Sequence, residues 1–165
     1  MAVRPIVPFP DARLRTPAAP VAAFDADLAA LAADLLDTMR AAPGVGITAC
    51  HVGVPQRLYV LELEPGEVRT YVNPVLLWSS PERIRHTEGS VSMPGATEEV
   101  ERAARVRIAF QDLDGTPREE EAEGFRAVCH QHEIDQLDGI FWLQRLSRLK
   151  RERVVKRYEK LKVGG

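Results

Sequence analysis

The chain has 165 residues, of which 45% are hydrophobic and 28% charged, with a formal net charge of −2. These values are typical of an ordinary globular domain, and they argue neither for nor against a polyanionic partner. We expect one domain over residues 1–165. Two cysteines, Cys50 and Cys129, are too few for a disulfide framework and are expected to be small buried apolar side chains. The sequence has no apolar run of about 18 residues and no secretory signal, so we expect a cytoplasmic protein.

In chain order, the sequence first predicts an extended arm over about the first twenty residues, because five prolines occur there. Apolar residues at three- and four-residue spacing from Leu28 to Met39 then predict an amphipathic helix that starts near Asp25. The middle of the chain, roughly residues 45–120, changes to the shorter period of strands. The clearest strand patterns cover residues 58–63, 68–72 and 106–110.

From about Glu121 the apolar spacing becomes helical again, and Gly139 marks the end of this second helix. A last, strongly basic helix is expected over about residues 147–161. Helices at both ends of a run of strands predict an α+β fold.

The second helix carries His132, Glu133 and Gln136, which almost match the metal-binding pattern H-E-x-x-H. In that pattern two histidines lie one turn apart on one face, and the glutamate beside them acts on a metal-bound water. Gln136 stands where the second histidine would be. A His-Glu pair in a helix is common by chance, so other segments must decide its meaning.

Two further segments give it meaning. The first runs from Gly44 to His51 and reads G-V-G-I-T-A-C-H, and the second runs from Glu88 to Ser92 and reads E-G-S-V-S. Together with Q-H-E-I-D-Q at residues 131–136, they resemble the ordered signatures G-x-G-x-A-A-x-Q, E-G-C-x-S and Q-H-E-x-D-H of the peptide deformylases. The resemblance covers nearly the whole chain, including the arm at residues 9–15 and the segment 145–150.

The resemblance implies a deformylase fold, with antiparallel strands packed around the central helix that carries His132 and Glu133, and with N- and C-terminal helices. It also implies a divalent metal, commonly iron, and removal of the formyl group from N-formylmethionyl chains. In the family, the third-motif glutamate moves the proton of the metal-bound water, and the first-motif glutamine and a backbone N–H bind the developing oxyanion. Carried over, these roles fall on Glu133, His51 and the Val91 N–H.

The resemblance further implies a substrate-binding set and a metal-ligand set. The expected substrate-binding residues are Val45, Gly46, Glu88, Arg102 and Cys129. Of the three metal-ligand positions only His132 is retained, because Ser90 replaces a cysteine and Gln136 replaces a histidine. A neutral hydroxyl and a neutral amide are poor substitutes for a thiolate and an imidazole. We therefore expect no metal or a weakly bound divalent metal such as Fe, Zn or Ni, and impaired or absent deformylation.

Three interpretations of the altered site remain open. His51, His132 and Glu133 could form a rearranged two-histidine, one-carboxylate metal site. Ser90 and His132 could instead work without metal as nucleophile and base. Alternatively Ser90, Gln136 and His51 fill an inherited pocket with a cluster of mutual hydrogen bonds. Among the other candidates, His86 is expected in an exposed loop, His130 in packing or solvent, and Asp135 on the helix surface or behind the ligands.

Between Arg145 and Lys162 there are nine basic and two acidic residues, which makes the last helix a segregated positive region. A solvated helix face is one interpretation, and the resemblance implies a second, which is contact with the phosphates of ribosomal RNA. The expected ligand of the protein is an N-terminal peptide or a small molecule, and neither a membrane nor DNA is expected as a partner.

Overall fold

The computed structural model describes residues 2–164 and contains three α-helices, seven strands and three short 3-10 helices in that part of the chain. The α-helices are α1 (Ala26–Ala41), α2 (Gly124–Leu137) and α3 (Arg148–Gly164). The strands are β1 (Gly46–Thr48), β2 (Leu58–Glu62), β3 (Val68–Ser79), β4 (Arg83–Glu88), β5 (Glu98–Ala103), β6 (Arg105–Gln111) and β7 (Pro117–Glu123). The 3-10 helices are η1 (Ala12–Arg15), η2 (Ala49–Val52) and η3 (Trp142–Arg145).

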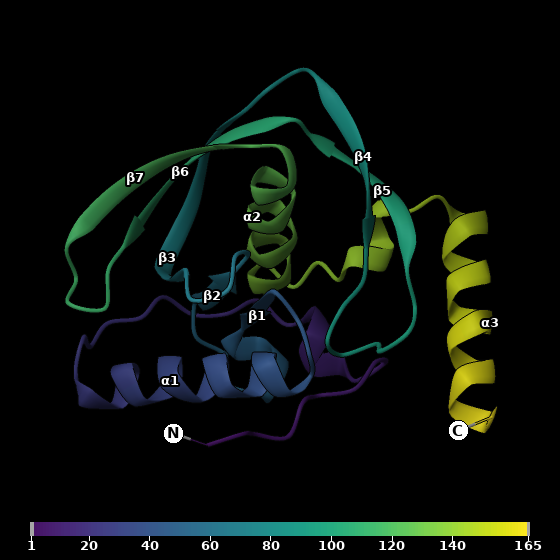
Figure 1. The fold of residues 1–165 in the computed structure, drawn as a ribbon, viewed down its shortest axis with the longest axis horizontal. Coiled ribbons are helices and arrows are strands. Elements are labelled where there is room, and N and C mark those ends of the chain that lie inside the picture. Colours follow the sequence, from purple (N-terminus) through teal and green to yellow (C-terminus); the bar gives the residue numbers. More distant parts are fainter. Residues whose placement is uncertain (1, 165) are drawn as a thin grey trace.

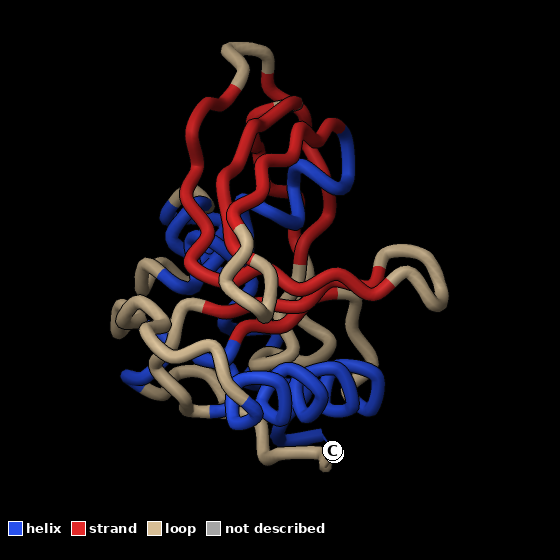
Figure 2. The backbone as a smooth tube through the Cα atoms, turned by 90° about the vertical axis from the view of Figure 1, so that its left-hand side faces the viewer, coloured by secondary structure: helices blue, strands red, loops and turns tan. Residues whose placement is uncertain are grey.

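The strands form two antiparallel sheets around α2. A five-stranded sheet has the order β1-β2-β3-β6-β7, and β4 pairs with β5 in a separate two-stranded sheet. In Figure 1, α2 stands between these two groups of strands, with α1 below it and α3 at the far side beyond β5. Figure 2 shows the strands reaching from the upper end into the middle of the molecule, with helical segments both beside them and at the lower end. The predicted α+β fold around a central helix is confirmed.

Helix α1 matches its predicted bounds because its sequence supplies both a cap and an apolar face. The Asp25 side chain accepts a hydrogen bond from the N–H of Leu28 at 3.1 Å, which satisfies a free donor of the first turn. Leu28, Leu35 and Met39 are buried on the face that packs against β1 and β2. The helix therefore supports β1, which lies within the first motif segment, residues 44–51.

The start of α2 differs from the prediction, because residues 121–123 belong to β7 and the helix begins at Gly124. Acidic side chains of β7 lie opposite basic ones of β6, as in the pairs Glu123–Arg105 and Glu121–Arg107. Opposite charges on facing positions stabilise an antiparallel pair. Gly124 then adopts φ +61°, where a residue without Cβ turns the chain from strand to helix at little cost.

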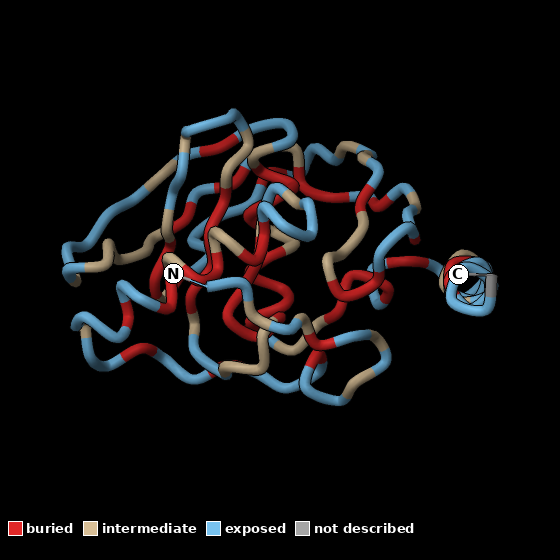
Figure 3. The backbone as a smooth tube through the Cα atoms, turned by 60° about the horizontal axis from the view of Figure 1, so that its bottom comes forward, coloured by how far each residue is buried: buried red, intermediate tan, exposed pale blue. Residues whose placement is uncertain are grey.

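The two ends of the chain are arranged differently. The arm is extended, as predicted, and contains η1; its Val7 N–H donates to the His51 carbonyl and its Phe9 N–H to the Ser92 carbonyl. Helix α3 buries mainly Val154 and Tyr158, which lies against Phe9, while most of its remaining residues are exposed (Figure 3). Both cysteines are buried and free, as expected. In the described part of the chain, no helix has the length and apolarity needed to cross a bilayer.

Candidate functional site

One cavity of about 420 Å³ lies between the loop that precedes β1, the loop that follows β4, and α2. All but two of the predicted site residues line it. The predicted residues that line the cavity are Val45, Gly46, His51, Glu88, Ser90, Val91, Cys129, His132 and Glu133. The two that do not line it, Arg102 and Gln136, point to other parts of the molecule. The three motifs thus meet at one place although they are far apart in the sequence.

His132 is held from behind by a buried carboxylate. Its Nδ1 lies 2.8 Å from Oε1 of Glu88. Hydrogen bonds from Arg102 and His132 overcome the effect of burial and lower the pKa of Glu88 to about 2, so the carboxylate is ionised and can only accept. Nδ1 of His132 therefore carries a proton, and Nε2 is the nitrogen left to the cavity. Burial alone would lower the pKa of His132, but the carboxylates of Glu133 and Glu88 outweigh it and raise that pKa.

Arg102 supports the Glu88 carboxylate and does not line the cavity, although the resemblance led us to expect a substrate contact. Its side chain is 4% exposed and donates to both oxygens of Glu88 at 2.8 Å and to Asp135 at 2.6 Å. Asp135 also accepts two hydrogen bonds from Arg145 at 2.8 Å. Asp135 is accordingly buried and lies behind the cavity, in an ion-pair network that fixes α2 to β4 and β5.

Glu133 is the least satisfied charged side chain of the cavity wall. It is buried, and its Oε1 has no hydrogen-bond partner among the described protein groups. Burial raises the pKa of Glu133 to about 7, although the neighbouring His132 opposes the shift. Its Oε2 lies only 2.7 Å from the place that a Cβ on Gly46 would occupy. The close approach of the carboxyl group therefore explains why a glycine stands at position 46.

Gln136 is turned away from the cavity and toward the arm. Its Nε2 donates to the backbone carbonyl of Leu14 at 2.7 Å, and the residue is buried. Ser90 does line the cavity, and its Oγ accepts from the Ser92 N–H at 3.1 Å. Among the hydrogen bonds of the described residues none joins Ser90, Gln136 and His51 to one another. The predicted cluster of mutual hydrogen bonds is wrong, because each of the three finds a local or backbone partner instead.

His51 has a defined tautomer. The backbone N–H of Thr48, which can only donate, lies 2.9 Å from Nδ1 of His51, so Nδ1 must be the unprotonated nitrogen. The proton is then on Nε2, which is buried and has no partner among the described protein groups. Burial, with a smaller contribution from His132, lowers the pKa of His51 to about 3, so the ring is neutral. His51 consequently offers one N–H donor at the cavity wall.

The side chains around the cavity do not fit the metal of the family. Neither nitrogen of His51 can bind a metal in this arrangement, since Nδ1 accepts from Thr48 and Nε2 is protonated. Ser90 and Gln136 contribute a neutral hydroxyl and an amide whose nitrogen is bonded to Leu14. In the described part of the chain, no group of three or more His, Cys, Asp or Glu is placed to hold a metal ion. His132 remains as a good ligand without partners of comparable strength.

The sequence reasoning gave no site role to two residues that bear on the site, one that lines the cavity and one that contacts His51. Phe125 lines the cavity, and its ring stacks on His86 with centroids 4.7 Å apart. His86 was expected in an exposed loop but lies within β4, a strand that the sequence pattern did not predict. His130 is fully buried between Tyr59 and Glu120, which agrees with a packing role and not with solvent. The second missed residue is Thr48, whose T-x-x-H spacing is that of a helix cap.

Known proteins resemble this chain over nearly its full length. The model of the polypeptide deformylase family matches residues 3–152. A peptide deformylase-like protein of Bradyrhizobium diazoefficiens is 66% identical over 165 residues, which cover 99% of this chain and 97% of that protein. A peptide deformylase of Phenylobacterium zucineum is 43% identical, with 97% of each chain covered. The crystal structure of a peptide deformylase from Legionella pneumophila superimposes with a TM-score of 0.92 at 40% identity, covering 98% of this chain and 96% of that one. With its three motifs gathered at one cavity, this chain belongs to the peptide deformylase family.

Proposed function

We propose that this deformylase-like protein binds the N-terminal segment of peptides in its cavity and has lost, wholly or largely, the ability to remove the formyl group. One observation carries the proposal: two of the three positions that bind the metal in the family hold Ser90 and Gln136, and the Gln136 amide donates to Leu14 at 2.7 Å. The cage lacks two of its ligands while the fold around it is intact.

The chemistry of the replaced ligands supports impaired metal binding. Thiolate and imidazole bind borderline metals strongly, whereas a hydroxyl and an amide are weak ligands for them. Removing even the groups that only orient a ligand lowers metal affinity about 10–100-fold. Loss of two direct ligands is expected to cost more. Any divalent metal, whether Fe, Zn or Ni, would then be held weakly.

The remaining cavity supports retained peptide binding. Its wall combines apolar groups, among them Val45, Phe125 and Val128, with the buried polar groups of His51 and Glu133. A pocket that is mostly apolar with a few oriented polar groups is suited to one side chain and one backbone group of a peptide. The volume of about 420 Å³ lies in the range of small-ligand pockets.

The proposed setting is the cytoplasm, and a proposed partner is the ribosome. The basic composition of the C-terminal segment supports contact with RNA phosphates, because residues 145–162 contain nine basic residues and only two acidic ones. A contact of this kind would weaken as the salt concentration rises, since it depends on exposed charges.

A paired measurement tests the proposed function. The protein is purified without oxygen, its Fe, Zn and Ni content is determined, and an N-formyl-Met peptide is added in parallel binding and hydrolysis assays. We expect far less than one metal per chain, saturable peptide binding and no release of formate. One tightly held metal per chain, or formate release at a rate comparable to that of a deformylase assayed beside it, would contradict the proposal.

One observation favours a second candidate, a metal-free hydrolase. His132 donates through Nδ1 to the ionised Glu88 at 2.8 Å, so Nε2 is the free nitrogen in the same cavity as Ser90. A nucleophile, a base and an orienting carboxylate are the parts of a serine hydrolase, although Ser90 Oγ accepts from Ser92 in this structure. Covalent labelling by a fluorophosphonate, lost in Ser90→Ala and kept in Ser92→Ala, would establish this activity. Equal labelling of the two variants, or none of the wild type, would exclude it.

A further inference from the structure

Strand β3 separates from its neighbour β2 part of the way along its length. β2 pairs with β3 only over residues 68–72. Asn73 then adopts φ +50°, and it is followed by Pro74, which has no N–H to donate to a neighbouring strand. Over residues 75–79 the strand pairs with β6. In the described part of the chain, no strand pairs with the opposite edge of this half of β3.

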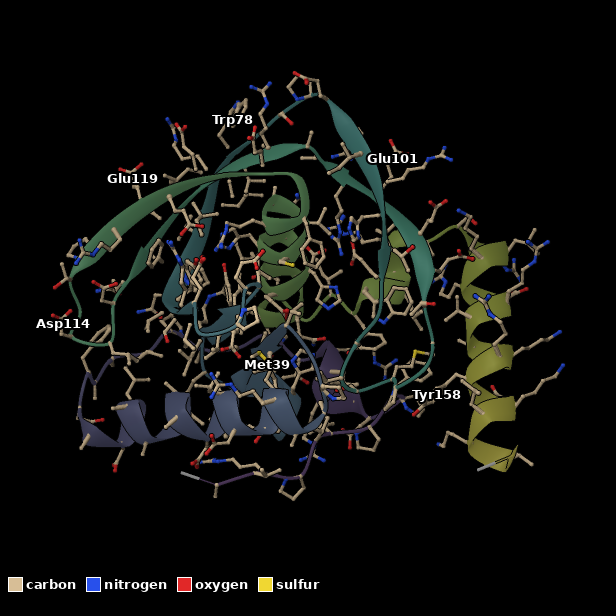
Figure 4. All side chains as sticks on the ribbon, in the orientation of Figure 1. Met39, Trp78, Glu101, Asp114, Glu119 and Tyr158 are labelled. Carbon is tan, nitrogen blue, oxygen red and sulfur yellow. The ribbon has the colours of Figure 1, made fainter. Side chains whose placement is uncertain are left out.

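Four consecutive apolar side chains occupy this half of β3, and we call residues 75–78 the apolar edge. Their exposed fractions are 54% for Val75, 40% for Leu76, 45% for Leu77 and 44% for Trp78. Leu76 lies opposite the buried Ile108 and so belongs to the inner face of the sheet. Trp78 lies opposite the exposed Arg107 and belongs to the outer face, and Figure 4 shows it on the outer side of the ribbon. Apolar side chains are therefore exposed on both faces of the strand.

The two ends of the five-stranded sheet are protected in ways that the apolar edge is not. At one end, residues 118–121 of β7 are all charged, and at the other end β1 has only three residues. Charged side chains and short strands are common means by which proteins prevent a sheet edge from pairing with another chain. Residues 74–79 include no charged side chain. The apolar edge therefore has the composition of a strand that is paired on both sides.

A second copy of this chain fits the apolar edge. Two identical strands can pair antiparallel about a two-fold axis, so that the same residues lie on both sides of the contact. Because residues 74–79 are uncharged, this pairing places no like charges opposite each other within that segment. Each copy then occupies the unpaired edge of the other, and the assembly stops at two chains.

We propose that the apolar edge is a homodimer interface, in which the β3 strands of two copies pair antiparallel about a two-fold axis located within residues 75–78. Four apolar side chains per copy are far fewer than the roughly 20–30 residues that each partner contributes to a standard interface. We therefore expect a weak dimer, with a dissociation constant of about 10–100 µM. None of residues 75–78 lines the cavity, so the dimer does not depend on the proposed peptide binding.

Sedimentation equilibrium of the full chain between about 1 and 300 µM tests the dimer. The wild type should change from monomer to dimer over this range. Leu77→Lys should weaken the dimer at least about tenfold, because two like charges would meet near the axis. The matched control is Leu149→Lys on α3, where the leucine is 58% exposed, and it should dimerise as the wild type does. A monomeric wild type, larger assemblies, or equal dimerisation of Leu77→Lys and the wild type would overturn the proposal.

Two further measurements test the strand pairing without introducing a charge. In the wild type, raising the protein concentration should slow hydrogen exchange at the amides of residues 75–79 and leave those of β7 unchanged. Leu77→Cys should be linked into a dimer by a short bis-maleimide, whereas Leu149→Cys should not; the native Cys50 and Cys129 are buried. A dimer without protection at residues 75–79, or one protected at β7 instead, would overturn the pairing through β3.

Discussion

Two groups of residues around His132 differ in how far their polar groups are paired. The frame that supports His132 consists of Glu88, Arg102, Asp135 and Arg145, which are joined by hydrogen bonds of 2.6–2.8 Å, so each charge has a partner. In the wall of the cavity, His51 Nε2 and Glu133 Oε1 are buried without a partner among the described groups. Frame residues are constrained by the folding of the chain, because losing one leaves a buried charge unpaired. The wall faces a cavity, so its residues can change without that penalty.

The largest effect is expected from breaking the frame with Arg102→Met. This change leaves the carboxylates of Glu88 and Asp135 buried with too few partners, so we expect a loss of about 3–5 kcal/mol in the free energy of unfolding. Urea unfolding measures it. Arg145→Met is the matched control, because this side chain is 46% exposed and Asp135 keeps Arg102; its loss should be clearly smaller. A loss below about 1 kcal/mol for Arg102→Met would mean that the frame does not constrain the fold.

The second-largest effect on stability is expected from His51 in the cavity wall, and it depends on pH. The pKa of His51 is about 3 in the folded protein against an ordinary value of 6.5, so its neutral form is preferred on folding. The contribution of the neutral His51 to the free energy of unfolding is fully present above about pH 6.5. It is lost as the pH falls toward 3, because the histidine of the unfolded chain takes up its proton first. Between neutral pH and about pH 4.5 the wild type should lose about 2–3 kcal/mol more than His51→Gln. Parallel stability curves of the two proteins would contradict the burial of a neutral His51.

A smaller effect is expected at Gly46, where the cavity wall meets β1. In Gly46→Ala the new Cβ would lie 2.7 Å from Glu133 Oε2 and 2.9 Å from the Leu61 side chain. Overpacking of this kind costs about 1–3 kcal/mol and should also displace the Glu133 carboxyl group. Thermal unfolding and peptide affinity measure both consequences. Gly66→Asn, in open space at a positive φ that asparagine tolerates, should be nearly neutral. Equal effects of the two changes would show that the close approach to Glu133 is unimportant.

The smallest effect is expected far from both regions, on α3. Arg148 and Glu152 are one turn apart at 3.1 Å, but their side chains are 88% and 57% exposed. Arg148→Ala should therefore change the free energy of unfolding by less than about 0.5 kcal/mol. Binding to ribosomes at low salt is the informative second readout. A stability loss above 1 kcal/mol would show that α3 contributes to the fold more than its exposure indicates.

Apolar periodicity and the three motifs predicted the elements that depend on local sequence. They did not predict contacts between residues that lie far apart in the sequence. Helix α1 and the helix of His132 followed from apolar spacing and from the ordered motifs. Strands β4 and β5 were missed because charged residues such as Arg83 and Glu101 take the place of apolar ones along them. Both residues are exposed, and Figure 4 shows Glu101 on the outer side of the ribbon. The bond from Gln136 to Leu14 joins residues 122 positions apart and could not be inferred from either segment.

The position of Arg102 is a second example of a contact that could not be inferred from the local sequence. A basic residue near a substrate motif is readily taken for a substrate contact, but its burial and its three carboxylate hydrogen bonds are tertiary facts. The Thr48–His51 pair was closer to prediction, since the two residues are three apart and form a cap. The tautomer that follows from it required the distance between the Thr48 N–H and Nδ1.

The most direct test is to restore the two ligand positions and titrate metal. In Ser90→Cys with Gln136→His, the Leu14 carbonyl that now accepts from Gln136 is available to accept from Nδ1 of the new histidine, which would leave Nε2 for the metal. Zn²⁺ or Ni²⁺ titration followed by calorimetry should show one tight equivalent for the double variant and only weak binding for the wild type. Equally tight binding by the wild type, or none by the double variant, would contradict the conclusion that the ligand positions changed while the frame remained.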